Sequence, residues 1–360
     1  MTVPITRTIA APLTLVAAAS LLLTGCALST PADNGVATPG STSSTLIQLD
    51  RPEISAHAED EAISYPITIE HALGETTIVE EPQRIVALGA VERDAVIALG
   101  AADRLVGAGV PFYDDSVNPW IDDLVSAEDF VAIPWDQNAQ YNIEQILSLD
   151  PDLILAPTSF TISTDYATLS AVVPTIAFLE NPITDRWQDV TQLTGDALGQ
   201  PARAAALVDE AESALSQLAE AYPGLQGKTV SFTVAQGGDA YGVLSDVNDT
   251  MIKNLSDLGL SVPAAVEALP ENPLNPGVSD ISIEEIGAID ADLILIAHMA
   301  PDAETATESS PLFDALDGVK DGGYQSLNLL AATALRTPTA LSLYWGLNTI
   351  SGTLSTVADK

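Results

Sequence analysis

The side chains best suited to chemistry in this chain are aromatic, basic and histidine residues that follow predicted strands. Aromatic residues make up only 5% of the 360 residues, so any cluster of them needs an explanation. Ligands of open α/β sheets bind beyond the carboxyl ends of the strands. The residues expected at such positions are Arg93, Tyr113, Trp120, Trp135, Tyr241, His298 and Arg336. Aromatic walls with a few polar groups suit a bulky, partly apolar ligand such as a metal chelate.

Several of these residues have an equally simple structural interpretation. Arg93 could pair with Glu92 or Asp94 instead of facing a ligand, and the same alternative stays open for Arg336. A single histidine, His298, does not make a metal site, because zinc and manganese sites need several converging ligands. We therefore expect no bound bare metal ion and no catalytic metal. Contact of His298 with an intact chelate, or axial ligation of haem, is the less favoured possibility.

The composition excludes several classes of function. The formal net charge is −38, from 12 basic and 50 acidic residues, which argues against nucleic acid binding and against attachment to anionic lipid through charge. The chain contains no G-x-S-x-G, H-E-x-x-H, P-loop or G-x-G-x-x-G motif. We therefore expect a non-enzyme without a cofactor, and an extracellular enzyme is kept as the alternative from another class.

A short unit occurs twice, at 142–155 and 282–295, with eight of fourteen positions identical. Asn142 and Ser282 suit helix N-caps, and Gln145 and Glu285 three residues later complete predicted capping boxes. Apolar residues then recur at helical spacing before a buried strand. The chain is therefore predicted to contain two comparable lobes.

Glu144 and Glu284 occupy the same position in the two copies. Neither the predicted cap nor the predicted core needs them. A favourable contact with the helix dipole would explain each, although Asp, Ser or Gln would serve as well. The duplication of glutamate itself is left without a local explanation.

Alternating strand and helix patterns predict parallel sheets with helices on both faces, before and after a purely helical stretch. The Ala-rich segment 201–222 has no interior Gly or Pro and predicts a helix over 30 Å long at about 1.5 Å per residue. The boundaries we expect are a signal peptide at 1–25, Cys26 with a flexible linker to 62, an N-terminal α/β lobe at 63–184, a helical connector at 185–223 and a C-terminal α/β lobe at 224–360.

The sole cysteine, Cys26, excludes internal disulfides. It follows an apolar run typical of a secretory signal, and Leu23-Thr24-Gly25-Cys26 resembles the lipobox of bacterial lipoproteins. This resemblance implies cleavage before Cys26 and lipidation of its sulfur by fatty acyl chains such as palmitate. The mature chain would then be extracytoplasmic and anchored to the outer face of the cytoplasmic membrane.

Together, the lipobox, the repeated unit and the stretches "HALGETTIVEEPQRIVALGAVERDAVIALG", "WQDVTQLTGDALGQPARAA" and "FDALDGVKDGGY" resemble iron-siderophore ABC transporter substrate-binding lipoproteins. These belong to the iron-complex and vitamin B12 periplasmic-binding family. The resemblance covers roughly residues 66–357. It implies a class III periplasmic-binding fold, in which two doubly wound α/β lobes are joined by one long rigid interlobe helix and hold a ferric complex between them.

The resemblance also implies partners. Glu144 and Glu284 match the glutamates that dock onto arginines of the ABC permease, which works with its ATPase. The expected ligand is a ferric siderophore and the expected state is a monomer. Because the chain has only eight arginines, a neutral or cationic hydroxamate complex is a better match than a tris-catecholate anion. A haem or cobalamin binding protein of the same fold is the alternative.

Overall fold

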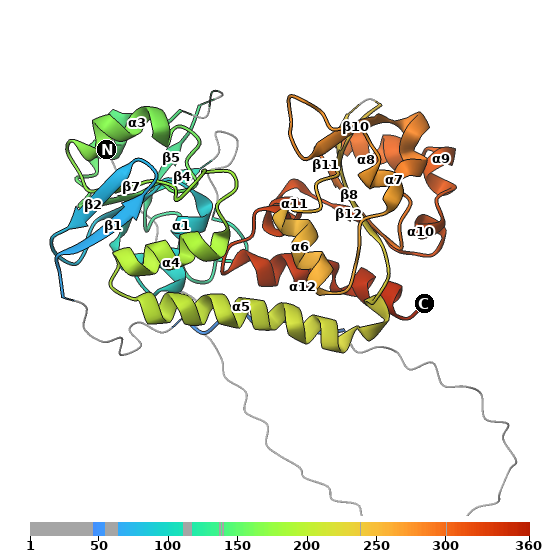
Figure 1. Ribbon diagram of the computed structural model, residues 1–360, viewed down its shortest axis with the longest axis horizontal. Helices are drawn as coiled ribbons and strands as arrows, with labels where there is room; N and C mark the ends of the chain where they lie inside the picture. The colour runs from blue at the N-terminus through green and yellow to red at the C-terminus, as the bar shows by residue number, and fades with distance from the viewer. Residues whose placement is uncertain are drawn as a thin grey trace, which may run out of the picture. The chain divides into compact units, whose positions relative to one another are not determined.

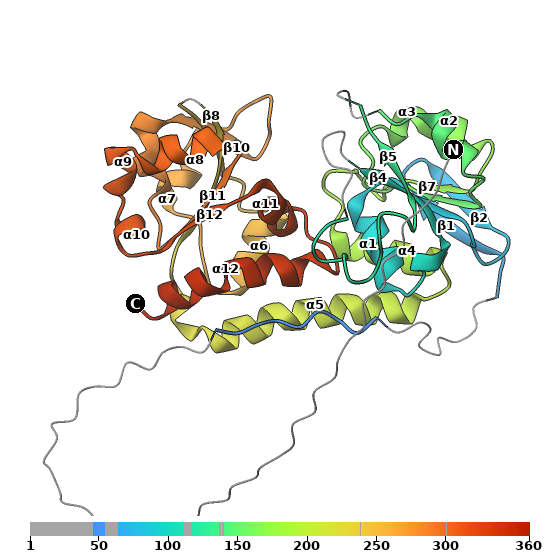
Figure 2. The ribbon, with the colours of Figure 1, turned by 180° about the vertical axis from the view of Figure 1, so that it is seen from behind.

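The computed structural model describes residues 46–54, 64–110, 117–136, 138, 140–237, 239–299 and 301–360. The expected signal peptide at 1–25, Cys26 and Tyr113 lie outside these residues. The described chain forms two α/β lobes that share the long helix α5, as Figures 1 and 2 show from opposite sides. Among the described residues, no helix is both long enough and apolar enough to cross a bilayer.

The N-terminal lobe contains a hairpin and a five-stranded sheet in the order β5-β4-β3-β6-β7. All neighbours in this sheet are parallel, as the alternation of strands and helices predicts. Its elements are β1 (Ile67–His71), β2 (Gly74–Ile78), β3 (Ile85–Ala87), α1 (Ala90–Ala98), η1 (Ala102–Arg104), β4 (Leu105–Val110), β5 (Val131–Pro134), α2 (Ile143–Ser148), β6 (Leu153–Leu155), α3 (Ile162–Ser170) and β7 (Thr175–Ile176).

The C-terminal lobe repeats this strand order with β10-β9-β8-β11-β12. In both sheets the first strand is central, the next two lie on one side and the last two on the other. Its elements are β8 (Val230–Gly237), β9 (Ala240–Leu244), α6 (Thr250–Asp257), α7 (Ala264–Glu267), β10 (Val278–Ser282), η3 (Ile283–Ile289), β11 (Leu293–His298), α8 (Pro301–Glu308), α9 (Pro311–Asp314), α10 (Asp317–Lys320), β12 (Tyr324–Leu327), α11 (Leu329–Arg336) and α12 (Ser342–Ala358).

The expectation of a parallel sheet is wrong for part of the C-terminal lobe. Strands β8 and β9 are antiparallel, as are β9 and β10, whereas β8, β11 and β12 are parallel. The reason is local: only positions 238 and 239 separate β8 from β9, and such a short connection can form a hairpin but not a crossover.

Two helices, α4 (Trp187–Ala197) and α5 (Pro201–Ala221), follow the N-terminal sheet. Pro201 stands at the first position of α5, where its missing N–H costs nothing. The 21 residues of α5 span about 31 Å at 1.5 Å per residue, which agrees with the predicted interlobe helix. Helix α4 packs against α1 and β1, so it belongs structurally to the N-terminal lobe.

Two further regions differ from the expected boundaries. Residues 46–54 fall within the expected flexible linker, yet Leu49 and Pro52 are buried against the folded body. In addition, Ala334 and Leu341 contribute to a core cluster otherwise built from the N-terminal lobe and the helices α4 and α5. The segment joining α11 to α12 therefore touches both lobes, although it lies in the sequence of the second.

Candidate ligand-binding site

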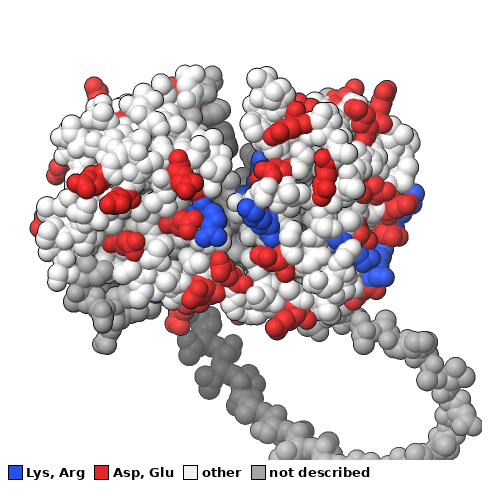
Figure 3. Space-filling model, in the orientation of Figure 1, with Lys and Arg blue, Asp and Glu red and all other residues white. Residues whose placement is uncertain are grey.

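A furrow separates the two lobes in the space-filling view of Figure 3, on the side opposite α5. Basic side chains (blue) lie on both sides of this furrow, and acidic side chains (red) lie close to them. In an open α/β sheet, the loops at the carboxyl ends of the strands form the ligand site. The residues at these ends are therefore the candidate ligand contacts.

An exposed aromatic pair lies at the carboxyl edge of the N-terminal sheet. Trp135 directly follows β5, and its ring stacks on Phe160 with centroids 5.6 Å apart and planes 18° from parallel. Phe160, in the loop between β6 and α3, is 54% exposed, and Trp135 is half-buried. Two stacked rings held at a surface form a rigid apolar platform. Sequence analysis named Trp135 but missed Phe160, whose only signal was its place after a strand.

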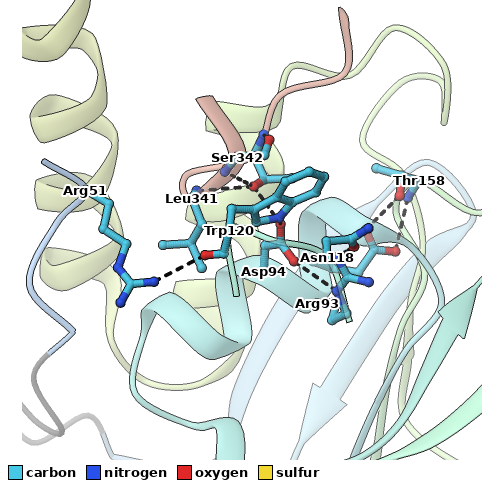
Figure 4. Close-up of polar contacts among 10 residues, drawn as sticks. Arg51, Arg93, Asp94, Asn118, Trp120, Thr158, Leu341 and Ser342 are labelled. Carbon is cyan, nitrogen blue, oxygen red and sulfur yellow. Dashed lines mark hydrogen bonds and ion pairs between the residues drawn. The ribbon is translucent and has the colours of Figure 1, made fainter. Parts of the chain in front are cut away.

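Trp120 was expected to line the cleft, but the structure buries it between the lobes. It is 6% exposed, and its indole N–H donates to the Asp94 carboxylate over 2.7 Å. The hydroxyl of Thr339, from the segment before α12, donates to the same carboxylate over 2.7 Å. The Trp120 ring also packs against Trp345 of α12 at 5.6 Å. Figure 4 shows this junction, in which Asp94 holds groups from both lobes.

The two candidate arginines both have acidic partners. Arg93 is 3% exposed, and its guanidinium lies 2.8 Å from Asp94 and donates to Asn118 over 2.7 Å (Figure 4). The alternative of pairing with Asp94 is therefore what the structure shows for Arg93, but in the interior and not on the surface. Arg336, at the end of α11, is half-exposed and lies 3.6 Å from Asp249. Neither arginine offers an unpaired charge to an anion.

A buried carboxyl group is bonded to the loop that carries Phe160. Glu92, in the first turn of α1, is fully buried and accepts a hydrogen bond from the Thr158 hydroxyl over 2.7 Å. Burial raises its pKa to about 7, although the Thr158 bond and the nearby Arg93 act in the opposite direction. The Glu92–Thr158 bond joins the segment after β3 to the segment after β6. These two strands are neighbours, and the chain order runs in opposite directions on either side of them. Glu92 therefore ties the first turn of α1 to the loop after β6.

The C-terminal edge carries a polar cluster instead of an aromatic stack. His298 ends β11, and its Nδ1 lies 3.2 Å from the hydroxyl of Ser326 on β12. Because that hydroxyl donates to Glu304, we assign the imidazole proton to Nδ1, which leaves Nε2 as an acceptor. Burial lowers the pKa of His298 despite the neighbouring carboxylates of Glu304 and Glu308, so the ring is neutral at neutral pH.

The remaining candidate, Tyr241, lies in the core of the C-terminal lobe. It is 3% exposed, and its hydroxyl bonds to Thr307 over 2.9 Å. The exposed apolar side chains at this edge are Met299, directly after β11 and 52% exposed, and Leu329, after β12 and 37% exposed. Sequence analysis named neither. The structure therefore places Trp135, Phe160, His298, Met299, Leu329 and Arg336 at the surface, and Arg93, Trp120 and Tyr241 inside.

The repeated unit has a structural explanation at most of its positions. Asp152 accepts hydrogen bonds from the backbone N–H groups of Gln83 and Arg84 before β3, over 2.8 and 2.9 Å. Asp292 does the same for Thr229 before β8, over 2.8 Å. The duplicated aspartate thus ties the start of each central strand to the strand beside it.

The repeated glutamates are different. Glu144 in α2 and Glu284 in η3 are both exposed, and each lies in the connection between the third and fourth strands of its sheet. Among the described residues, neither carboxylate has a hydrogen-bond or ion-pair partner. Their duplication is therefore not explained by any contact within the described chain.

No group of three or more His, Cys, Asp or Glu side chains in the described residues is arranged to hold a metal ion. This result concerns bare ions only. A chelated metal brings its own ligands and needs shape, apolar area and a few polar contacts from the protein.

Comparisons with known proteins agree with the two-lobed architecture. A cobalamin-binding protein of Halobacterium salinarum is 30% identical over 169 residues, 46% of this chain and 43% of that protein. An iron-uptake system-binding protein of Bacillus subtilis is 25% identical over 201 residues, 53% of this chain and 59% of that protein. The chain thus spans about half the length of the curated relatives it matches.

A solved structure covers more of the molecule. The chain is similar to PiaA of Streptococcus pneumoniae in complex with ferrichrome, with 26% identity, a TM-score of 0.63, and coverage of 81% of this chain and 99% of that one. A family model described as periplasmic binding protein matches residues 85–322, more than half of the chain. The chain therefore belongs to the periplasmic binding protein family, whose members bind solutes.

Proposed function

We propose that this protein is a lipid-anchored, extracytoplasmic binding protein that captures a ferric siderophore and delivers it to an ABC permease for iron uptake. The observation that carries the proposal is the exposed Trp135–Phe160 stack at the carboxyl edge of the N-terminal sheet. Met299 and Leu329 extend apolar area at the corresponding edge of the other lobe. A large, partly apolar chelate fits such surfaces.

The electrostatics favour a ligand with little negative charge, such as a hydroxamate complex. Arg93 and Arg336 each have an aspartate partner, and His298 is neutral at neutral pH. A tris-catecholate anion would have to compete with Asp94 and Asp249 for these cations, at a cost in desolvation. The solved relative that binds ferrichrome supports the same preference.

Cobalamin is the second candidate ligand, because the Halobacterium relative is named for it. Cobalamin is also bulky, and the apolar surfaces at the two edges would accept it. We therefore test both ligands together with haem.

The test is a titration of the protein that follows its own tryptophan fluorescence. Ferric hydroxamates, ferric catecholates, cobalamin, haem and free Fe(III) are added separately, with the iron-free chelators as controls. Saturable quenching by ferric hydroxamates alone would support the proposal. Quenching only by cobalamin or haem would replace the ligand, and no saturable quenching by any of them would contradict an iron-chelate function. Trp120 and Trp187 are 6% and 3% exposed, and Trp345 packs against Trp120 at the interlobe junction, so a Trp135→Phe variant should lose most of the response.

Delivery to the permease is assigned to Glu144 and Glu284, because both are exposed, lie at equivalent places in the two lobes and lack a partner in the described chain. Carboxylates of this kind suit bidentate pairing with arginines of a two-fold permease. The double variant Glu144→Ala/Glu284→Ala should keep its ligand affinity and lose stimulation of the permease ATPase in proteoliposomes. The matched control replaces Glu70 and Glu267, which are also exposed and lie one in each lobe. Equal stimulation by all variants would refute docking through these residues.

Anchoring is assigned to Cys26, which lies outside the described residues. The Cys26→Ser variant should be released from membranes and should not incorporate labelled palmitate. Labelling that persists in this variant would contradict the assignment.

A further inference from the structure

Residues 46–54 form a segment that contacts the C-terminal lobe at one end. The Ile47 N–H donates to the hydroxyl of Tyr222, at the end of α5, over 3.1 Å. The side chain of Asn348 in α12 makes two hydrogen bonds to the Leu49 backbone. Its Oδ1 accepts from the Leu49 N–H over 2.8 Å, and its Nδ2 donates to the Leu49 carbonyl over 2.9 Å. Leu49 is 6% exposed and belongs to the core cluster of that lobe. Figure 2 shows the segment running along α5.

The other end of the segment contacts the N-terminal lobe. Arg51 donates two hydrogen bonds to the carboxylate of Asp123, over 2.7 and 2.6 Å, and one to the Trp120 carbonyl over 3.2 Å. Figure 4 shows Arg51 beside Trp120. Arg203, near the start of α5, donates to the Glu53 carbonyl over 2.8 Å. Ile54 packs against the core cluster of the N-terminal lobe.

The segment has little slack between these two sets of contacts. Ile47 bonds to Tyr222, directly after the last residue of α5, and Glu53 bonds to Arg203, near its first residue. Along a helix, these two α5 positions are about 28 Å apart at 1.5 Å per residue. Six extended residues span only about 20 Å. The segment is therefore nearly extended, and the long side chains of Tyr222 and Arg203 cover the remaining distance.

The contact with Trp120 places the segment next to the junction between the lobes. Trp120 and Thr339 share the carboxylate of Asp94, so the junction holds both lobes through one buried group. A movement of the N-terminal lobe relative to α12 would have to displace Arg51 from Trp120 and Asp123, or Leu49 from Asn348. A segment that is already nearly extended cannot take up such a movement by lengthening.

We propose that residues 46–54 are an interlobe strap, a second connection beside α5 that restricts movement of the lobes relative to each other. The strap lies within the expected linker and is packed against the folded body. The proposal does not depend on the chemistry of the ligand. It predicts that adding slack to the strap, with its anchoring contacts kept, increases lobe movement.

The experiment inserts six Gly and Ser residues between Asp50 and Arg51 of the full chain carrying Cys26→Ser. Leu49 and Arg51 keep their local partners in this variant, so its thermal midpoint should stay close to that of the parent. Because Cys26 is the only native cysteine, spin labels can be placed at Ser163→Cys in α3 and Ala265→Cys in α7, which are exposed and lie one in each lobe. The same insertion after Leu274, which is 93% exposed in a loop, is the matched control.

We expect a broader interlobe distance distribution for the strap insertion than for the parent or the loop insertion. Amide exchange at 339–342 should also become faster. Arg51→Ala should reproduce both effects, whereas Arg186→Ala, which removes an exposed pair with Asp189, should not. If the strap insertion gives the same distance distribution and exchange as the loop insertion, the segment is packed passively and the proposal is wrong.

Discussion

The two lobes have the same strand order, but the carboxyl edges of their sheets are built differently. The N-terminal edge presents the exposed stack of Trp135 and Phe160, and its α1 carries a buried carboxyl group, Glu92. The C-terminal edge presents the cluster of His298, Ser326 and Glu304, with apolar Met299 beside it. A common scaffold thus supports an aromatic half-site and a polar half-site. The comparison teaches that the shared scaffold determines where the candidate site lies, whereas the loops determine which side chains can contact a ligand there.

The charged groups differ between the lobes in the same way. Arg93 of the first lobe is enclosed with Asp94 at the interlobe junction, whereas Arg336 of the second lobe is half-exposed and 3.6 Å from Asp249. Buried pairs are costly to break because removal of one partner leaves an uncompensated charge. Exposed pairs contribute little. Substitutions in the first lobe should therefore have larger effects on stability.

The largest effect is expected for Asp94→Ala. This change leaves Arg93 buried without its ion-pair partner and removes the acceptor for Trp120 and Thr339. We expect the free energy of unfolding, measured by denaturant titration, to fall by about 3–5 kcal/mol. The control Asp189→Ala breaks an exposed pair with Arg186 and should cost below about 1 kcal/mol. Similar losses for the two variants would show that the junction is not a principal stabilising contact.

Glu92→Gln should change how stability depends on pH. The folded-state pKa of Glu92, about 7, is above its unfolded value of 4.5. Its protonated form therefore stabilises the protein fully below pH 4.5, and this contribution is lost as the pH rises through 7. The loss between pH 5 and pH 8 is about 2.5 kcal/mol. The Gln variant should lack this part of the pH dependence in denaturant titrations at several pH values, and an unchanged profile would contradict a buried, raised-pKa Glu92.

Trp135→Ala should weaken ligand binding without a comparable loss of stability, because the side chain is half-buried at the surface. We expect the dissociation constant from calorimetry to rise about tenfold, or ~1.4 kcal/mol. Phe160→Ala should weaken binding in the same direction, since it removes the other ring of the stack. Replacement of Ile183, an apolar side chain in the loop after β7 that is 72% exposed, serves as the control. If the two aromatic variants bind as tightly as the parent, the ligand does not contact the Trp135–Phe160 stack.

The smallest effect is expected on the thermal midpoint, when the two helix caps of the repeated unit are weakened one at a time. In the second copy, the Glu285 carboxylate accepts from the backbone N–H of Ser282 over 3.0 Å, which lowers its pKa. In the first copy, Gln145 instead donates to the Ala132 carbonyl, so the expected capping box there lacks its reciprocal bond. Glu285→Ala should therefore lower the thermal midpoint at pH 7 and lose this effect in acid. Gln145→Ala should show no such pH dependence, and a pH-dependent loss in both variants would exclude this difference between the caps.

Sequence patterns predicted most of the elements but not the direction of every strand. The β1–β2 hairpin, the parallel N-terminal sheet, α5 and the repeated helix–strand unit follow from local periodicity and caps. The antiparallel β9 and β10 were missed because strand direction depends on connection length and pairing, not on the pattern within a strand. The expected helix at 283–289 forms as the 3-10 helix η3, a difference that periodicity alone does not resolve.

The candidate site was only partly predictable. The sequence named Trp135, His298 and Arg336, which reach the surface, and it also named Trp120 and Tyr241, which do not. Both the exposed and the buried candidates were named by the same criterion, a position near the end of a predicted strand. Burial depends on neighbours that are distant in the chain, such as Thr339 for Asp94 and Trp345 for Trp120. No local pattern contains that information.

The sequence by itself determined the two-lobed α/β class, the long α5 and the duplication of Glu144 as Glu284, because periodicity, caps and repeats are local properties of the chain. Only the tertiary structure decided that Arg93 and Trp120 close the junction between the lobes, that Phe160 joins Trp135, and that residues 46–54 bind both lobes. Each of these depends on groups brought together across long sequence separations. Their partners are set by packing, which is a property of the whole folded chain.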